Sequence, residues 1–470
     1  MINHFNFERK GDKFLITNDF GRYDFLETTT FRELVQTQDV TDPYKRKELK
    51  EKGFLIDRSV AELSEELPDQ IRQMKNYVFS PTSLFLFTVT NSCNLNCIYC
   101  QAKDKGSSLG GYMTPEVGRR AVDIALQSPS HSLTFEFQGG EPLLNFNTIK
   151  AVVEYTEQKK GLREIEYTLV SNLAFLTDDK INFFRKYNVQ ISTSLDGPAI
   201  IHNRNRVYPK DMNSYGWAIR GINKLRAAGL LSGAIETTTR NSLPYAQEIV
   251  DEYVNQGFQS VFLRPLTPLG FAQADWERVG YPTEEFLSFY KNALKYILTI
   301  NKQGIYLREQ TAAYFLRQIM ANDPYNYMEL RSPCGAGIGQ MSVYYDGEIY
   351  TCDEGRMVSE SGDFAFHLGN VWENSYRDLV SNSVCRTTCI ASVTECIPGC
   401  CDCVYQPYCG VCPVVTHSLE YSIFPREPHG YRCRVNKGIM DILFQYLYEK
   451  DSDVMNIFRS WIGEEQDERE

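Results

Sequence analysis

An alternation of short apolar segments and helical patterns between residues 83 and 265 constrains the fold of this chain more than any other feature. The predicted strands cover 83–90, 133–137, 167–170, 189–193, 234–238 and 260–265, with helices at 115–127, 146–159, 177–187, 215–228 and 244–256. Successive strand–helix units predict parallel strands joined by right-handed crossovers. Six units are too few to close an eight-stranded barrel, so we expect an α/β fold with an open, partial (β/α)6 TIM barrel. Its chemistry should lie at the carboxyl ends of the strands.

Unusual polar or glycine-rich motifs follow the first four predicted strands. They are Cys93, Cys97 and Cys100 after the first strand, Gly139-Gly140-Glu141 after the second, Ser171-Asn172 after the third, and Ser194 to Pro198 on the fourth. The carboxyl ends of parallel strands lie on one rim of a barrel, so these motifs are predicted to meet there.

The 14 cysteines fall into two groups. Three lie at 93–100, none lies between 101 and 333, and eleven lie within 334–433. The start of the chain lacks a basic segment followed by an apolar one, so we expect no secretory signal. Cysteines in a cytoplasmic chain indicate metal binding or catalysis rather than disulfides. Thiolates select zinc, copper(I) or iron–sulfur clusters, and three ligands would leave one iron of a cubane open.

Composition excludes several partners. The net charge is −11 and the pI is about 5.3, which argues against nucleic acid or an anionic membrane as the main partner. No apolar run approaches the roughly 20 residues that a membrane span needs. We therefore expect a cytoplasmic protein with no membrane association.

The spacing Cys93-x3-Cys97-x2-Cys100, set in this strand pattern, resembles the radical S-adenosylmethionine (SAM) enzymes over about residues 83–270. The resemblance implies that these cysteines hold a [4Fe–4S] cluster whose fourth iron binds SAM. It implies SAM contacts for five further positions: Tyr99 on the adenine, Gly139, Gly140 and Glu141 at the methionine amine, and Ser194 on the ribose or carboxylate. Asn172 is placed similarly. The implied chemistry is reductive cleavage of SAM to a 5′-deoxyadenosyl radical, which abstracts hydrogen from a substrate.

The later cysteines resemble the SPASM extension of that family. The resemblance implies one auxiliary [4Fe–4S] cluster on Cys400, Cys403, Cys409 and Cys433, and a second on Cys334, Cys352 and Cys412. The Cys409-x2-Cys412 spacing is one residue shorter than the usual pattern, so Cys412 is the weakest match. The alternative is a zinc ribbon, which also uses C-x2-C pairs.

Several residues of this region keep open assignments. Cys385, Cys389, Cys396 and Cys401 are left over, and the sequence does not choose among them for the missing fourth ligand. Asp353 matches a position where some relatives place a catalytic base, and it could equally be a solvated turn residue.

Residues 1–60 predict a small sheet followed by helices. Strand-like segments lie at 5–8, 13–17 and 22–26, helices at 31–35 and 43–52, and a further strand at 54–56. This order resembles the winged-helix precursor-peptide recognition element of peptide-modifying enzymes, which implies that a leader peptide adds as a strand to the sheet edge. The alternative is a structural cap without a ligand.

The predicted domains follow from these patterns. They are a recognition domain at 1–60, a helical linker at 61–82, the barrel and its following helices at 83–325, a SPASM domain at 326–436, and a closing helix with an acidic tail at 437–470. The helices after the barrel are expected at about 283–300 and 307–320, where apolar residues recur at helical spacing.

Runs such as Gln138 to Phe146, Ser192 to Pro198 and Asp353 to Met357 resemble the peptide maturase of the His-Xaa-Ser system. The resemblance implies a maturase that installs a thioether or carbon–carbon crosslink in a ribosomally made precursor peptide. Its implied electron donor has a low potential, such as flavodoxin or ferredoxin. Members of that group often lack equivalents of Cys334, Cys352 and Cys412, which this chain has.

Two alternatives stay open. One is an anaerobic sulfatase-type maturase that forms formylglycine, and the other is a zinc-stabilised peptide-binding protein without catalysis.

Overall fold

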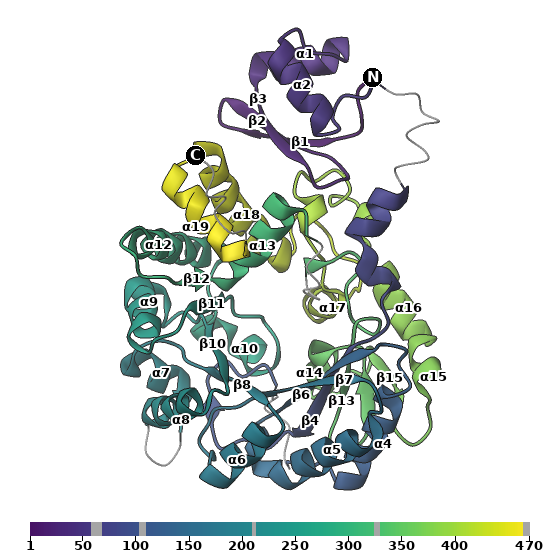
Figure 1. Ribbon diagram of the computed structural model, residues 1–470, viewed down its shortest axis with the longest axis vertical. Coiled ribbons are helices and arrows are strands. Elements are labelled where there is room, and N and C mark those ends of the chain that lie inside the picture. The colour runs from purple at the N-terminus through teal and green to yellow at the C-terminus, as the bar shows by residue number, and fades with distance from the viewer. Residues whose placement is uncertain (58–67, 103–109, 209–212, 324–329, 464–470) are drawn as a thin grey trace.

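The computed structural model describes residues 1–57, 68–102, 110–208, 213–323 and 330–463. It is a mixed α/β structure with one large sheet, a small N-terminal sheet and a cysteine-rich C-terminal region (Figure 1). Residues 61–67 of the predicted linker and the predicted acidic tail from 464 lie outside the described residues.

The large sheet has ten strands in the order β12-β11-β10-β8-β7-β6-β4-β13-β14-β15. Six of them pair in parallel and follow one another along the chain, as predicted. These are β4 (Leu84–Thr90), β6 (Ser132–Gly139), β7 (Glu164–Val170), β8 (Gln190–Ser194), β10 (Leu231–Thr237) and β11 (Ser260–Arg264). Within the described chain β12 (Arg308–Glu309) forms one edge and β15 (His367–Asn370) the other, so the sheet is open.

Helices between the strands cover the apolar face of this sheet (Figure 1). Burial along β6 alternates, so Phe135 and Phe137 face the helices while Glu136 and Gln138 face the opposite side. The covering helices are α4 (Pro115–Ala125), α5 (Phe146–Lys159), α6 (Asp178–Lys186), α7 (Ala199–Asn205), α8 (Ser214–Ala228), α9 (Ala246–Asn255) and α12 (Thr283–Lys302). The opposite side of the sheet carries more polar side chains, among them Glu136 and Gln138.

The cysteine-rich region continues the large sheet, which the sequence patterns did not predict. β13 (Gln340–Val343) pairs in parallel with β4, and β14 (Glu348–Tyr350) and β15 then pair antiparallel. Short helices complete the region: α14 (Asp353–Ser359), α15 (Tyr376–Val380), α16 (Ser383–Ile390) and α17 (Pro413–Glu420). Outside this region, two further short helices, α10 (Gly270–Ala274) and α11 (Trp276–Val279), lie between β11 and α12.

The N-terminal domain is an antiparallel sheet with two helices on it. β1 (Asn6–Lys10), β2 (Lys13–Thr17) and β3 (Tyr23–Glu27) precede α1 (Thr28–Thr37) and α2 (Pro43–Glu51). It has its own buried core, which includes Ile16, Leu34 and Phe54. The strand predicted at 54–56 is wrong, because this segment makes only an isolated bridge between Leu55 and Ile2.

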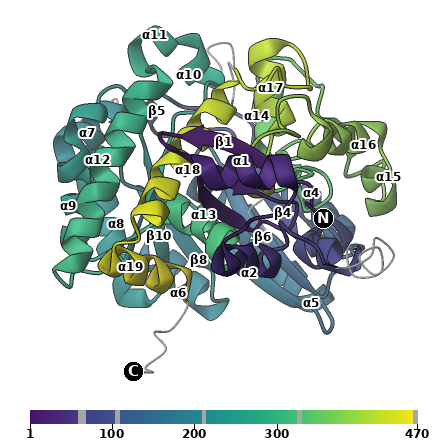
Figure 2. The same ribbon diagram turned by 90° about the horizontal axis from the view of Figure 1, so that it is seen from above.

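The N-terminal domain packs on the C-terminal helices (Figures 1 and 2). The rings of Tyr23 and Phe444 are 5.2 Å apart, and those of Phe25 and Tyr448 are 5.1 Å apart. These contacts join β3 to α18 (Tyr431–Glu449), beside α13 (Gln310–Ala321) and α19 (Ser452–Ile462). The sequence patterns predicted one closing helix within 437–470, whereas the structure has two, α18 and α19.

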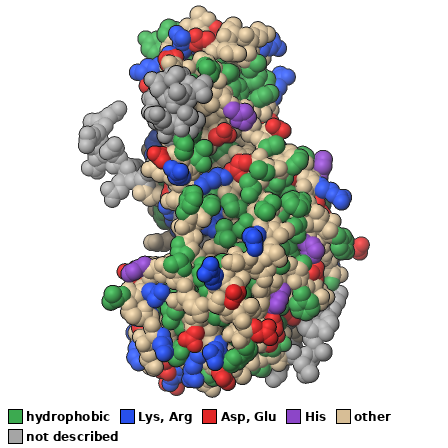
Figure 3. Space-filling view, turned by 90° about the vertical axis from the view of Figure 1, so that its right-hand side faces the viewer, with side chains coloured by type: hydrophobic (Ala, Val, Ile, Leu, Met, Phe, Trp, Pro, Cys, Tyr) green, Lys and Arg blue, Asp and Glu red, His purple; other side chains and the backbone are tan. Residues whose placement is uncertain are grey.

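The surface in Figure 3 mixes Lys and Arg with Asp and Glu, and no broad basic patch covers this face. Among the helices that the structure describes, none is long and apolar enough to cross a membrane.

Candidate active site and metal centres

The loop that carries Cys93, Cys97 and Cys100 is fixed to the rim of the sheet by backbone bonds. The Gly140 N–H donates to the Thr90 carbonyl (2.8 Å), and the Glu141 N–H donates to the Ser92 carbonyl (2.8 Å). A Cβ on Gly139 would lie 2.1 Å from the Thr90 oxygen, and one on Gly140 would lie 2.3 Å from the Ser92 oxygen. The two glycines therefore allow the loops after β4 and β6 to approach each other.

Glu141 joins the ends of β6 and β7. It is fully buried, and its carboxylate accepts bonds from the Leu143 N–H (3.0 Å), the Ser171 hydroxyl (2.8 Å) and the Asn172 N–H (2.8 Å). Burial raises the pKa of Glu141, and these three donors lower it. The structure thus gives Glu141 a positioning role, and its contact with a methionine amine stays a prediction.

Asn172 and Ser194 lie beside the cysteine loop. The Asn172 side-chain amide donates to Asn94 Oδ1 (2.9 Å) and lies 3.9 Å from Cys93 Sγ. Asn172, Ser194 and Leu95, which stands between Cys93 and Cys97, line one small cavity. The structure therefore places two of the residues that the resemblance assigns to SAM, Asn172 and Ser194, beside the cysteine loop.

Tyr99 belongs to a buried ion-pair network that the sequence patterns missed. Its hydroxyl donates to Asp196 Oδ2 (2.8 Å), and Arg206 Nε donates to Asp196 Oδ1 (3.1 Å). The Arg206 guanidinium lies 5.3 Å from the centre of the Tyr99 ring. β5 (Asn96–Cys97) pairs antiparallel with β9 (Arg206–Val207), which places Cys97 opposite Arg206. This network clamps the cysteine loop to the end of β8, and a role of Tyr99 at adenine stays a prediction.

His202 supports this clamp as a neutral ring. It is buried, and its Nδ1 accepts the Asp196 N–H (3.3 Å). Burial lowers the pKa of His202 to about 4. The unfolded state binds a proton near pH 6.5 and the folded state only near pH 4, so stability should fall as pH drops through this window.

We expect the His202 contribution to fall by about 2 kcal/mol between pH 7 and pH 5. Urea unfolding of the wild-type protein and of His202→Gln at both pH values measures this change. The variant should lose less stability than the wild type over that interval. Equal losses in both proteins would show that His202 does not titrate in this way.

The three loop thiols lie close enough to influence one another. Burial raises the pKa of Cys97, the Arg206 charge lowers it, and the charges of Cys100 and Cys93 raise it again. An anionic group on these sulfurs would therefore be partly compensated by Arg206.

A second thiol set consists of Cys400, Cys403, Cys409 and Cys433. Burial raises the pKa of Cys409 to about 12, with a further rise from Cys403, while a bond from Asn436 lowers it. The Asn436 side-chain amide lies 3.7 Å from Cys409 Sγ. Burial raises the pKa values of Cys400 and Cys433, and the charges of Glu427, Cys409 and Cys403 raise both further, so the four thiols influence one another.

A third set consists of Cys334, Cys352 and Cys412, which lie in one buried cluster. Burial raises the pKa values of Cys352 and Cys412, and Cys334 raises both further. Cys352 precedes α14, where its Sγ accepts the Gly355 N–H (3.3 Å), and Cys412 precedes α17. The short spacing before Cys412 does not prevent it from joining the other two.

The leftover cysteines are placed differently from one another. A hydrogen bond from Cys389 lowers the pKa of Cys385 on α16, and the charges of Cys389 and Cys334 both act on Arg331. Cys396 is exposed, and Cys401 Sγ donates to Asp402. The fourth ligand of the third set stays open.

The donor chemistry of these sets fits iron–sulfur clusters. All three contain thiols only, the ligands that such clusters use. Among the residues that the structure describes, no three Cys, His, Asp or Glu side chains converge tightly enough to enclose a single metal ion.

Asp353 is buried and paired. Its Oδ1 accepts bonds from Arg356 Nη2 (2.7 Å) and Nε (3.2 Å), and the Arg356 side chain is itself buried. Glu136 of β6, which the sequence patterns did not single out, carries the second buried carboxylate. Burial raises the pKa of Glu136, with a further rise from Asp353, and Gln138 and Thr168 donate to it. The two carboxylates therefore have different partners and influence each other.

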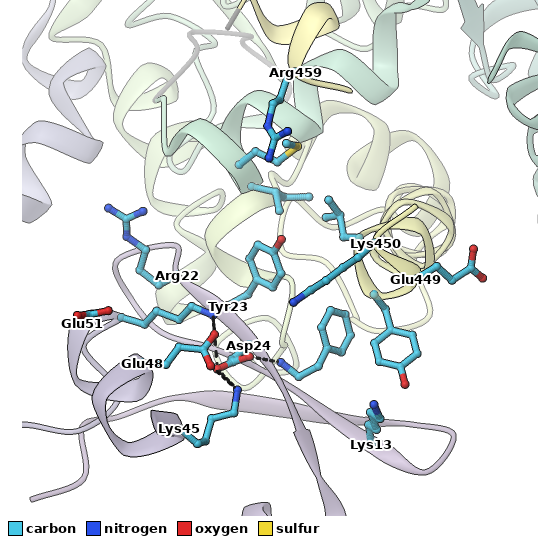
Figure 4. A pocket seen from close by; sticks show the side chains of 16 residues that line it. Lys13, Arg22, Tyr23, Asp24, Lys45, Glu48, Glu51, Glu449, Lys450 and Arg459 are labelled. Atoms are coloured by element: carbon cyan, nitrogen blue, oxygen red, sulfur yellow. Dashed lines mark hydrogen bonds and ion pairs between the residues drawn. The ribbon is translucent and has the colours of Figure 1, made fainter. Parts of the chain in front are cut away.

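A groove of about 930 Å³ lies between the N-terminal domain and the C-terminal helices, beside the ring contacts that join β3 to α18 (Figure 4). Tyr23, Asp24 and Phe25 form one side, and Lys450 and Arg459 point into it from the other side. Asp24 Oδ1 accepts the Phe25 N–H (2.8 Å), while Lys45 and Lys52 lie 3.0 and 3.4 Å from Oδ2. In the described chain β3 pairs only with β2, so this edge of the sheet faces the groove.

The lining of the groove is more basic than acidic. It contains six basic and four acidic side chains: Lys13, Arg22, Lys45, Lys52, Lys450 and Arg459, and Asp24, Glu48, Glu51 and Glu449. Glu48 and Asp24 engage Lys45 and Lys52, whereas Arg22, Lys450 and Arg459 make no ion pair with any other residue that the structure describes.

Comparison with known proteins places this geometry in context. Residues 87–261 match the family model of the Radical SAM superfamily. The cysteine-type anaerobic sulfatase-maturating enzyme of Clostridium novyi is 22% identical over 383 residues, which cover 78% of this chain and 95% of that enzyme.

Two solved structures share the fold. The structure described as native anSMEcpe with bound AdoMet has a TM-score of 0.69 at 20% identity and covers 80% of this chain and 100% of its own. Streptococcus suis SuiB bound to precursor peptide SuiA has a TM-score of 0.53 at 14% identity and covers 91% of this chain and 99% of its own.

Proposed function

We propose that this protein, an enzyme of the radical SAM superfamily related to peptide-modifying maturases, installs a thioether or carbon–carbon crosslink in a ribosomally made precursor peptide. The observation that carries this proposal is the joint presence of three features. They are the Cys93–Cys100 loop beside Asn172 and Ser194, two further thiol sets, and a groove along the β3 edge of the N-terminal sheet. The peptide maturase of the His-Xaa-Ser system remains the more specific resemblance.

Each thiol set has a proposed role. Cys93, Cys97 and Cys100 hold the cluster that binds SAM, which when bound supplies one-electron cleavage to a 5′-deoxyadenosyl radical. Asn172 and Ser194 orient SAM, with backbone contacts from the Gly139-Gly140 segment. Cys400, Cys403, Cys409 and Cys433 hold one auxiliary cluster, and Cys334, Cys352 and Cys412 hold another. Flavodoxin or ferredoxin is the proposed electron donor.

Asp353 and Glu136 are the proposed proton acceptors. Arg356 donates two hydrogen bonds to Asp353 and so orients that carboxylate, while burial raises the pKa of Glu136 and makes its carboxylate a stronger proton acceptor. A proton released from the peptide could therefore be held by Glu136 beside Asp353.

The N-terminal domain is the proposed docking site for the peptide. Its three strands and two helices support a winged-helix-like recognition domain at 1–60, ahead of the partial barrel and a SPASM domain at 326–436. A peptide strand that adds along β3 would replace Asp24 at the Phe25 N–H and lie in the groove. The printed name of SuiB bound to its precursor peptide supports peptide docking in a related fold.

The decisive experiment coexpresses the protein with a small open reading frame next to its gene under anaerobic conditions, followed by mass spectrometry of the peptide. A loss of about 2 Da per linkage, with fragments joined across it, is the expected result, because each crosslink removes two hydrogen atoms. An unmodified peptide alongside active SAM cleavage would contradict this function.

Formylglycine formation is the second candidate, which the name of the Clostridium novyi relative favours. Conversion of cysteine to formylglycine would leave an aldehyde, which a hydrazide reagent detects. An aldehyde without a crosslink would decide for this candidate.

Charge reversal in the groove should weaken peptide binding. Lys450→Glu with Arg459→Glu replaces two positive charges that point into the groove. We expect the affinity for an acidic leader to fall at least tenfold, as measured by fluorescence anisotropy, with a wild-type affinity that falls as salt rises. Lys150→Glu, at an exposed position of α5 far from the groove lining in sequence, is the matched control. Unchanged binding by the double variant would remove the groove from the proposal.

A further inference from the structure

The N-terminal sheet contacts the loop that carries Cys400 and Cys403. The Asn6 side-chain amide donates to the carbonyls of Cys401 (3.0 Å) and Cys403 (3.1 Å). The Thr17 hydroxyl donates to the Val404 carbonyl (2.7 Å). Asn6 is 8% exposed and Thr17 is 1% exposed, so these bonds are shielded from water. The sheet therefore fixes the backbone next to two of the four thiols.

One rung of this sheet reaches from the thiol loop to the groove. Thr17 pairs with Asn6 on one side and with Tyr23 on the other. Asn6 and Thr17 bind the loop, whereas Tyr23 lines the groove. A displacement of β3 by an occupant would thus act on the same rung that holds the thiol loop.

Aromatic packing joins the same two regions independently. The Tyr23 ring lies 5.2 Å from that of Phe444, which lies 5.5 Å from Tyr405 and 5.8 Å from Tyr408. The Tyr408 hydroxyl donates to the Gly21 carbonyl (3.0 Å), just before β3. Tyr405 and Tyr408 lie between Cys403 and Cys409, so both ends of this contact chain are fixed.

A charged pair of the sheet, Lys10 and Glu8 of β1 (2.8 Å), also lies beside the thiol loop. Lys10 belongs to β1 and lies 5.2 Å from the centre of the Tyr405 ring. Charge and hydrogen bonds near sulfur ligands set the reduction potential of a cluster.

We propose that Asn6 and Thr17 are positioning residues for the cluster on Cys400, Cys403, Cys409 and Cys433, and that occupancy of the groove changes the reduction potential of that cluster through the Asn6–Thr17–Tyr23 rung. This inference rests on the proposed function, because it requires that cluster. The coupling is reciprocal, so reduction of the cluster would change peptide affinity by the same factor.

A redox titration followed by electron paramagnetic resonance tests the loop end of the rung. The reconstituted full-length protein is compared with Asn6→Ala and Thr17→Val, of which the second keeps the side-chain shape. We expect the reduction equilibrium of one cluster to change at least threefold in each variant, about 28 mV at 59 mV per tenfold. The signal that responds to SAM should stay unchanged.

Asn3→Ala is the matched control, because the Asn3 amide donates to the Gly53 carbonyl within the N-terminal domain (2.9 Å). It should leave all potentials at their wild-type values. Wild-type potentials in Asn6→Ala and Thr17→Val, with full iron content, would overturn the positioning role.

Tyr23→Ala tests the groove end, where the side chain makes no hydrogen bond to the thiol loop. We expect it to shift the same potential, while Tyr44→Ala on the exposed face of α2 does not. A wild-type potential in Tyr23→Ala would overturn the coupling. If wild-type protein binds no iron at all, the proposed function fails, whereas bound iron with unmoved potentials defeats only this inference.

Discussion

Replacement of Cys97 by serine should abolish SAM cleavage, with a rate at least about a thousandfold below wild type, which corresponds to about 4 kcal/mol. A serine hydroxyl does not supply the thiolate that a cluster needs, and only two sulfurs would remain at the loop. Cys97 is also the thiol opposite Arg206 in the β5–β9 pair, and the positive charge of Arg206 favours its thiolate.

The measurement combines iron and sulfide content with formation of 5′-deoxyadenosine under dithionite. Cys396→Ser is the control, because Cys396 is exposed and outside the three thiol sets. Cys97→Ser should lose about four irons and keep its other clusters, whereas Cys396→Ser should keep its full iron content. Wild-type cleavage and iron content in Cys97→Ser would contradict the assignment of the loop.

Arg206→Gln should cost about 3–5 kcal/mol of folding stability, the largest structural effect that we expect of a single substitution. Asp196 is fully buried, and removal of Arg206 leaves its carboxylate with an uncompensated charge. The substitution should also loosen the cysteine loop, since Arg206 pairs with Cys97 and Val207 pairs with Asn96.

Urea unfolding at pH 7 measures this loss, and the double variant with Asp196→Asn completes a cycle. The double variant should be more stable than the Arg206→Gln single variant, because it removes the stranded charge. Arg204→Gln, at an exposed position two residues away, should change stability by less than about 0.5 kcal/mol. A loss below about 1 kcal/mol in Arg206→Gln would show that the pair contributes little.

Local patterns predicted much of the fold. The six parallel strands and the helices between them follow from periodicity, because each unit is specified by neighbouring residues. The small strands β13, β14 and β15 could not be predicted in the same way. They have four residues or fewer, and their place depends on pairing with β4, far back in the chain.

The site shows the same division. Cysteine spacing grouped the thiols, but side-chain partners depend on distant segments. Glu141 accepts hydrogen bonds from Ser171 and Asn172, and Tyr99 donates one to Asp196. These partners lie at least 30 residues apart in the sequence, so only the fold brings them together. The groove brings Tyr23 opposite Arg459, and no local pattern relates two positions so far apart. The sequence signal that could have suggested the ion-pair network is Asp196, which lies in the Ser192 to Pro198 run that the resemblance singled out, ten residues before Arg206.

The pairing of β13 with β4 has a consequence for the order of events during synthesis. β4 leaves the ribosome long before Gln340 to Val343 exist, so one edge of the first barrel strand waits for a partner. The N-terminal domain has its own core and can fold early. The residues on which it packs, Val404 and Phe444, are synthesised only near the end of translation. Pairings of such long range form slowly. Cluster loading should therefore follow completion of the chain, and a chaperone that shields the β4 edge should raise the yield of holoenzyme.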